Sequence, residues 1–124
     1  MKRTCFVAVV SLAVMGVFLG SAQAACTPTG FYRDNINLTA ALINPTATVQ
    51  GDLDATGCNI GVYYNATSST AYKVHEAFVH GANYFGVVND GVVVDVTNST
   101  IYDIGENPLN GDQHGVAVYF GTSA

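Results

Sequence analysis

The sequence Ile60-Gly61-Val62-Tyr63 recurs as Phe85-Gly86-Val87-Val88 and again as His114-Gly115-Val116-Ala117. The glycines of the three copies lie 25 and 29 residues apart. A repeat of this length is typical of solenoids, in which each unit buries its apolar face only against its neighbours. The repeat therefore predicts a chain coiled on itself.

A second set of positions explains the unequal spacing. Val74 and Val79 recur 22 residues later as Val96 and Ile101, so we interpret the coil as about 22 residues long. The additional residues, 106–112, are rich in turn formers and include a proline, which cannot donate to a central strand ladder. We expect them to form a protruding loop.

Apolar residues alternate within each unit, which is the pattern of strands. Val92, Val94 and Val96 are expected to face inward. The same parity places Ile60 with Val62 inward, on either side of a glycine. Asparagines between the strands tolerate left-handed backbone, and we expect them to stack at the corners.

One window contains helix formers, Leu38 to Ile43, and it is stopped by Asn44-Pro45. A solenoid exposes its terminal coil as an unpaired edge, which something must cover. We therefore expect a short N-terminal helix that caps the end of the core.

The first residues indicate export. Lys2 and Arg3 precede an apolar run of 15 residues and the small-residue pattern Ala22-Gln23-Ala24. This is typical of a secretory signal peptide, and the run is shorter than the roughly 20 residues of a membrane-spanning helix. We divide the chain into a signal peptide (1–24), an N-terminal capping segment (25–45) and coils (46–124). The expected location is extracellular or periplasmic, after cleavage near Ala24.

Charge excludes one class of partner. Without the signal peptide the chain keeps nine acidic residues and only two strong bases, Arg33 and Lys73, for a formal charge of minus seven. Binding to nucleic acid requires clustered Lys and Arg, so nucleic acid is not an expected partner. The sequence leaves the oligomeric state open.

The mature chain contains two cysteines, Cys26 and Cys58. An even pair in an oxidising compartment suggests a disulfide, which would tie the N-terminal segment to the first coil. Two buried free thiols are the alternative.

The stretches Val74–Val87 and Val96–Gly105 resemble coils of secreted right-handed parallel β-helix proteins of the pectin-lyase-like superfamily. The resemblance covers most of residues 46–121. It implies an all-β, right-handed parallel β-helix of about three coils, in a short or truncated member. Members differ widely in activity, so the fold alone does not assign a function.

The enzymes of this family use groups that the chain lacks. The resemblance implies a basic Arg or Lys beside calcium-holding carboxylates for the lyases, yet Arg33 lies before the first coil and Lys73 between coils, so neither is expected on a strand face beside an acidic cluster. The glycosidases need paired carboxylates, and the family's Asn-Thr-Asp and double-Asp motifs are absent. We assign no catalytic residue and expect a structural, adhesive or glycan-binding module. The alternative is a fragment of a carbohydrate-active enzyme whose catalytic coils lie outside this chain.

Tyrosines recur along the coils, and rings that face outward would offer flat surfaces to a polysaccharide or cell-surface glycan. The four candidates for glycan contact are Tyr63, Tyr84, Tyr102 and Tyr119. The alternative for each is packing within a sheet, which tyrosine favours.

No cofactor is expected. His75 and His80 are five residues apart on one strand and are expected to face opposite sides, which does not favour a histidine metal site. Acidic residues in loops suit calcium, which prefers oxygen ligands. Calcium is therefore an alternative at Asp52, Asp54, Asp90, Asp103, Glu106 or Asp112.

Overall fold

The computed structural model describes residues 25–105 and 114–119, and this part of the chain is all β with no helix. The expected signal peptide and the loop expected over 106–112 lie outside the described residues. No helix suited to crossing a membrane occurs in the described ranges. The strands are β1 (Thr27–Arg33), β2 (Ile36–Ile43), β3 (Val49–Asp54), β4 (Ile60–Tyr64), β5 (Tyr72–His80), β6 (Phe85–Asp90), β7 (Val94–Thr97), β8 (Thr100–Tyr102) and β9 (His114–Tyr119).

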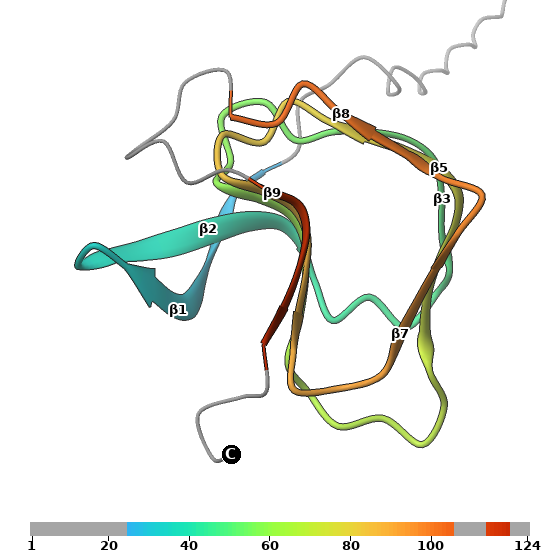
Figure 1. The fold of residues 1–124 in the computed structure, drawn as a ribbon. Coiled ribbons are helices and arrows are strands. Elements are labelled where there is room, and N and C mark those ends of the chain that lie inside the picture. The colour runs from blue at the N-terminus through green and yellow to red at the C-terminus, as the bar shows by residue number, and fades with distance from the viewer. Residues whose placement is uncertain (1–24, 106–113, 120–124) are drawn as a thin grey trace, which may run out of the picture.

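Two sheets contain these strands. Sheet A has the order β1-β2-β4-β6-β9, and sheet B has the order β3-β5-β7 with β8 also paired to β5. The pair β1–β2 is antiparallel, and all the other pairs described are parallel. From β2 onward the chain alternates between the sheets, except that β7 and β8 both belong to sheet B, and its successive passes lie over one another in Figure 1.

The repeated residues pair in register. Val62 pairs with Val87, and Val87 pairs with Val116, so the three glycine-containing copies lie side by side in sheet A. In sheet B, Val74 pairs with Val96, as the 22-residue spacing predicts. The register that the sequence repeat predicts is confirmed in both sheets.

Gly61 and Gly86 lie where side chains of sheet B reach close to the backbone of sheet A. A Cβ on Gly61 would lie 2.5 Å from the carbonyl oxygen of Gly86 and 2.6 Å from Cγ1 of Val79 in sheet B. A Cβ on Gly86 would likewise meet Ile101 of sheet B and lie 2.5 Å from the carbonyl oxygen of Gly115. Both glycines are therefore required by space rather than by an unusual backbone angle.

The expected parity around these glycines is wrong in one respect. Val62 packs between the sheets in what we call the inner cluster, whereas Ile60 packs elsewhere, in the outer cluster. Gly61 itself faces Val79 of sheet B, on the same side as Val62, so strict alternation is broken at this glycine and Ile60 lies on the opposite side of sheet A.

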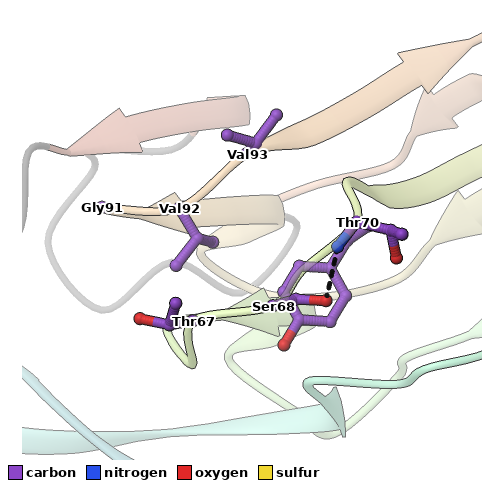
Figure 2. Close-up of a pocket in the computed structure, with 7 residues that line it drawn as sticks. Thr67, Ser68, Thr70, Gly91, Val92 and Val93 are labelled. Carbon is purple, nitrogen blue, oxygen red and sulfur yellow. Dashed lines mark hydrogen bonds between the residues drawn. The ribbon is translucent and has the colours of Figure 1, made fainter.

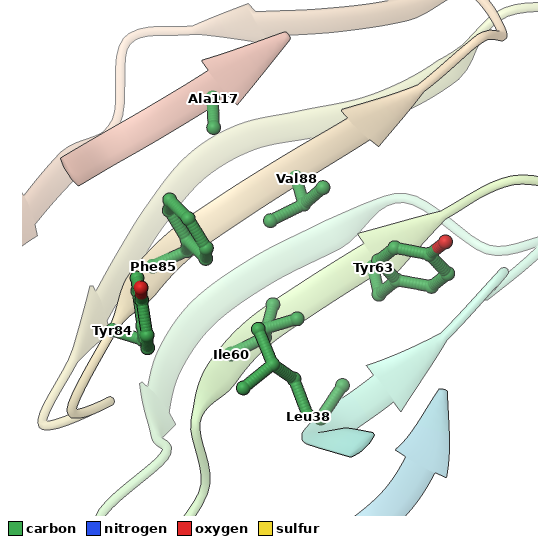
Figure 3. Packing of buried hydrophobic residues seen from close by; sticks show 8 residues of the cluster. Leu38, Ile60, Tyr63, Tyr84, Phe85, Val88 and Ala117 are labelled. Carbon is green, nitrogen blue, oxygen red and sulfur yellow. The ribbon is translucent and has the colours of Figure 1, made fainter. Parts of the chain in front are cut away.

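The inner cluster is built from both sheets, and the predicted inward positions Val92, Val94 and Val96 pack against it. The outer cluster contains no residue of sheet B and lies on the other face of sheet A. Figure 3 shows this outer cluster along β2, β4, β6 and β9: Leu38, Ile60, Tyr63, Tyr84, Phe85, Val88 and Ala117. Sheet A is therefore apolar on both faces.

The expected capping helix is wrong: Leu38 to Ile43 belongs to strand β2. Six residues are too few to sustain an isolated helix, and here Ala40 pairs with Ile60 of β4. The chain reaches β2 through a two-residue hairpin turn at Asp34 and Asn35, whose φ angles are 51° and 63°. Aspartate and asparagine tolerate this left-handed backbone, which such tight turns require.

The β1–β2 hairpin covers the outer face of sheet A. The Phe31 ring lies near one aromatic ring from each of three strands, at centroid distances of 5.7 Å (Tyr63), 6.3 Å (Phe85) and 5.1 Å (Tyr119). Arg33 donates a hydrogen bond of 2.7 Å to the Tyr119 hydroxyl. Because β1 and β9 are the two edges of sheet A, these contacts show that the hairpin reaches across the whole sheet.

Asparagines stack at the corners, as predicted. Asn44 Nδ2 donates to Asn65 Oδ1 at 2.8 Å, and Asn59 Nδ2 donates to Asn83 Oδ1 at 2.9 Å. Each pair joins successive passes of the chain, so the side-chain amides extend the backbone ladder around the turns.

The Cys26–Cys58 disulfide is confirmed. It joins the residue before β1 to the segment between β3 and β4, where Cys58 is fully buried with Ala55 and Ala82. The bond closes a loop across a sequence separation of 32 residues and attaches the hairpin to the sheets.

We predict that Gly86→Ala lowers the free energy of unfolding by about 2 to 3 kcal/mol, because the added methyl group must displace a backbone carbonyl. Gly115→Ala is the matched control, since its Cβ would lie at an ordinary 3.6 Å from Ile101. Its effect should stay below about 0.5 kcal/mol. Urea unfolding of both variants measures the difference, and equal losses would contradict the proposed close approach.

We predict that replacing both Cys26 and Cys58 with serine costs about 3 to 4 kcal/mol of stability, the loop-closure value for a separation of this size. Urea unfolding of the oxidised protein and of the double variant gives the comparison. Adding a reductant to the wild-type protein should lower its stability by the same amount, and adding it to the variant should have no effect. A loss of stability in the reduced variant would contradict the assignment of the effect to this disulfide.

Candidate functional site

The outer face of sheet B presents two rows of side chains across β3, β5 and β8. Asp52, Phe78 and Thr100 pair in register in one row, and Asp54, His80 and Tyr102 pair in the next. Residues between them point into the inner cluster: Leu53, Val79 and Ile101. We call the six outward residues the platform.

The platform carries two exposed aromatic rings. Phe78 is 50% exposed and Tyr102 is 40% exposed. The Tyr102 ring stacks on the His80 ring with a centroid distance of 4.8 Å and an interplanar angle of 17°. Nε2 of His80 lies 3.0 Å from Oδ1 of Asp52. This chain of contacts holds the Tyr102 ring at a defined position on the surface.

Asp54 is held in its charged form. The Thr56 hydroxyl donates to Oδ1 of Asp54 at 2.6 Å, and the Thr56 backbone N–H donates to the same oxygen at 3.0 Å. These hydrogen bonds, the one from the hydroxyl first, lower the pKa of Asp54 against an opposing effect of burial, and the charge of the nearby His80 makes the smallest contribution, which also lowers the pKa. The carboxylate is therefore anionic at neutral pH.

Further along the same face, Nζ of Lys73 lies 3.7 Å from Oδ2 of Asp95. Nδ1 of His75 lies 2.8 Å from the Thr97 hydroxyl. Like the platform, these side chains face away from the inner cluster, so the outer face of sheet B is polar on either side of its aromatic residues.

The expectation that His75 and His80 face opposite sides is wrong, because β5 contains an irregularity at Glu76. The φ angle of Glu76 is 53°, and the pairing with β3 shifts register at this point. The extra residue of such a bulge moves the following side chains to the other face. As a result, Phe78 and His80 point outward on the same side as His75.

The four candidate tyrosines occupy different environments. Tyr102 lies on the platform, as described above. Tyr63 and Tyr84 are buried, with 2% and 0% exposure, so the expectation that these rings meet a glycan at the surface is wrong. The hairpin covers them because their strand face is one of the two apolar faces of sheet A. Tyr119 is half-buried beneath Phe31.

The buried tyrosine hydroxyls differ in their partners. Tyr63 donates to Oδ2 of Asp90 at 2.5 Å, and burial together with this carboxylate raises its pKa. The hydroxyls of Tyr64 and Tyr84 are buried without a hydrogen-bond partner among the described residues. Burial raises the pKa of Tyr64 to about 12, with a smaller contribution from Tyr72.

A separate pocket of about 180 Å³ lies between the segment after β4 and the turn before β7 (Figure 2). Hydroxyl groups and apolar side chains line it: Thr67, Ser68, Thr70, Tyr72, Gly91, Val92 and Val93. Two of these groups already have partners, since Tyr72 donates to the Ala66 carbonyl and the Thr70 N–H donates to Ser68. The lining includes no carboxylate, imidazole or amine, so the platform is the chemically richer surface.

The acidic residues named as calcium ligands do not converge where they can be placed. Asp90 accepts the Tyr63 hydrogen bond, and Asp54 accepts those of Thr56. Glu106 and Asp112 lie outside the described residues. Within 25–105 and 114–119, no group of three or more His, Cys, Asp or Glu side chains is placed to hold a metal ion.

Phe78 and Thr100 are platform residues that the sequence did not indicate as a site, and Asp52 was expected there only as an alternative calcium ligand. A signal for the bulge was present, because strict alternation from an outward His75 would point the apolar Val79 outward and the polar His80 inward. Comparisons with models of protein families, with curated proteins and with solved structures find no match. The assignment of a function therefore depends on the geometry of the platform.

We predict that stability falls as the pH rises above about 10, the pKa of an unfolded tyrosine. Tyr63 and Tyr64 have raised pKa values in the folded chain, so their contribution is complete below pH 10 and is lost at higher pH. Each should reduce the free energy of unfolding by about 1.4 kcal/mol per pH unit in this range. Urea unfolding at a series of pH values measures the slope.

Tyr64→Phe is the control for this prediction, because its hydroxyl has no described partner to lose. The variant should fold at neutral pH and show a shallower decline in alkali. An unchanged slope would contradict the assignment to Tyr64.

Proposed function

We propose that the chain is an exported module with the architecture of a right-handed parallel β-helix of about three coils, and that it binds glycans through the platform on sheet B. The exposed pair Phe78 and Tyr102 carries this proposal. The resemblance to secreted β-helix proteins of the pectin-lyase-like superfamily is consistent with it, as is the parallel pairing of successive passes.

The platform has the chemistry that sugars require. The C–H-rich face of a pyranose packs against an aromatic ring, and its hydroxyls exchange hydrogen bonds with carboxylates and side-chain hydroxyls. Phe78 lies between Asp52 and Thr100 across three adjacent strands, with strand spacing of about 4.8 Å. A linear glycan that runs across the strands would thus meet a carboxylate, an aromatic ring and a hydroxyl in succession.

The disulfide supports the proposal that the chain is exported. Disulfides persist mainly in oxidising compartments such as the periplasm and the extracellular space. The sequence pattern of residues 1–24 is that of a signal peptide. Both observations favour a working location outside the cytoplasm.

We predict that the double variant Phe78→Ala with Tyr102→Ala loses binding to insoluble polysaccharides by tenfold or more, because both exposed rings are removed. Pull-down of the purified mature protein on a panel of insoluble glycans measures the bound fraction. Tyr32→Ala is the matched control, since Tyr32 is 60% exposed but lies at the hairpin turn. It should leave binding unchanged.

Two outcomes would overturn the proposal. Binding that survives in the platform variant, or that is lost equally in Tyr32→Ala, would place the glycan elsewhere or show nonspecific adsorption. Release of soluble fragments from any glycan would favour the alternative, a fragment of a carbohydrate-active enzyme.

A further inference from the structure

The charge around the platform is distributed unevenly. Four acidic residues lie along the outer face of sheet B or at its bend, namely Asp52, Asp54, Glu76 and Asp95, against one lysine. That lysine, Lys73, already has a carboxylate partner in Asp95. The surface beside the aromatic rings therefore carries more carboxylates than amines.

Each of the two platform carboxylates has one oxygen that can still bind a ligand. The described hydrogen bonds of Asp52 and Asp54 all use Oδ1. Oδ2 of each carboxylate can thus accept a further donor without breaking the contacts that position Tyr102 and the Asp54 side chain. Ammonium groups are the strongest donors that a glycan can offer to a carboxylate.

We propose that the preferred ligand is a linear glycan with free amino groups, such as a polymer of glucosamine units; this inference rests on the proposed function. A sugar ring lies on Phe78, and ammonium groups of that or neighbouring units pair with Asp52 and Asp54. Hydroxyls of the same chain meet Thr100 and the Tyr102 hydroxyl. The two rows of the platform then contact consecutive parts of one extended ligand.

The same charges disfavour a polyuronate. A carboxylate on each sugar unit would be placed beside Asp52 and Asp54, where like charges repel. The resemblance to pectin-lyase-like proteins implies uronate polymers for some members. The platform charge thus points to a ligand of the opposite sign.

The test compares three soluble probes with the same mature protein: a fully deacetylated glucosamine oligomer, its N-acetylated counterpart and a galacturonate oligomer. Titration calorimetry at mildly acidic pH measures affinity. We expect the deacetylated oligomer to bind about tenfold more tightly than the acetylated one, and the galacturonate oligomer not to bind. Raising the salt concentration from about 20 to about 300 mM should remove most of that preference.

The variants separate a specific site from the general acidity of the protein. Asp52→Asn with Asp54→Asn should reduce the preference to less than about threefold, while the amide oxygens can still accept the hydrogen bonds of His80 and Thr56. Asp34→Asn removes a charge at the hairpin turn, where asparagine tolerates the left-handed backbone. It should leave the preference intact. Phe78→Ala, which alters no charge, should weaken both glucosamine probes.

Each outcome is decisive. Equal affinity for the acetylated and deacetylated oligomers, tighter binding of galacturonate, or an equal effect of Asp34→Asn would overturn the inference and leave the proposed glycan-binding function standing. Binding of none of these probes, together with none of the insoluble glycans, would overturn both.

Discussion

The close approach of the two sheets at Gly61 and Gly86 is the constraint on which the rest of the stack depends. At this level Val79 and Ile101 of sheet B reach into the space that a side chain would fill in sheet A. Side chains elsewhere hold packed sheets about 10 Å apart. The glycines remove that spacing locally, so that successive passes can pair in register while both sheets share one inner cluster.

Sheet A has apolar residues on both faces. The inner face is covered by sheet B, and the outer face by the β1–β2 hairpin through Phe31. Burying the large rings of Tyr63 and Phe85 provides much of the hydrophobic stabilisation. The hairpin is attached at one end by the Cys26–Cys58 disulfide and at the other by the Arg33 contact with Tyr119. The hairpin therefore covers apolar residues of the core, the role that the sequence analysis expected a helix to have.

The repeat predicted the parts of the fold that depend on spacing, but not those that depend on which side a residue faces. The pairing of Val62 with Val87 and of Val74 with Val96 follows from sequence distance alone. The burial of Tyr63 and Tyr84 does not, because it requires knowledge that the hairpin folds over the outer face. The turn at Asp34-Asn35 was a usable signal for that hairpin, and the weak helix propensity of the following window concealed it.

The platform was hidden for a related reason, since it exists only because of the bulge in β5. Without an extra residue at Glu76, the alternation that points His75 outward would also point Ala77 and Val79 outward and would bury Phe78. Glutamate seldom adopts a positive φ angle, so its identity does not signal a bulge. The neighbouring pass adopts the same bend at Asn98, where φ is 48°, and the Ala77 N–H donates to the Ser99 hydroxyl beside it. Two adjacent strands thus share the irregularity, and the strain at Glu76 is offset by the burial of Val79 that the bend permits.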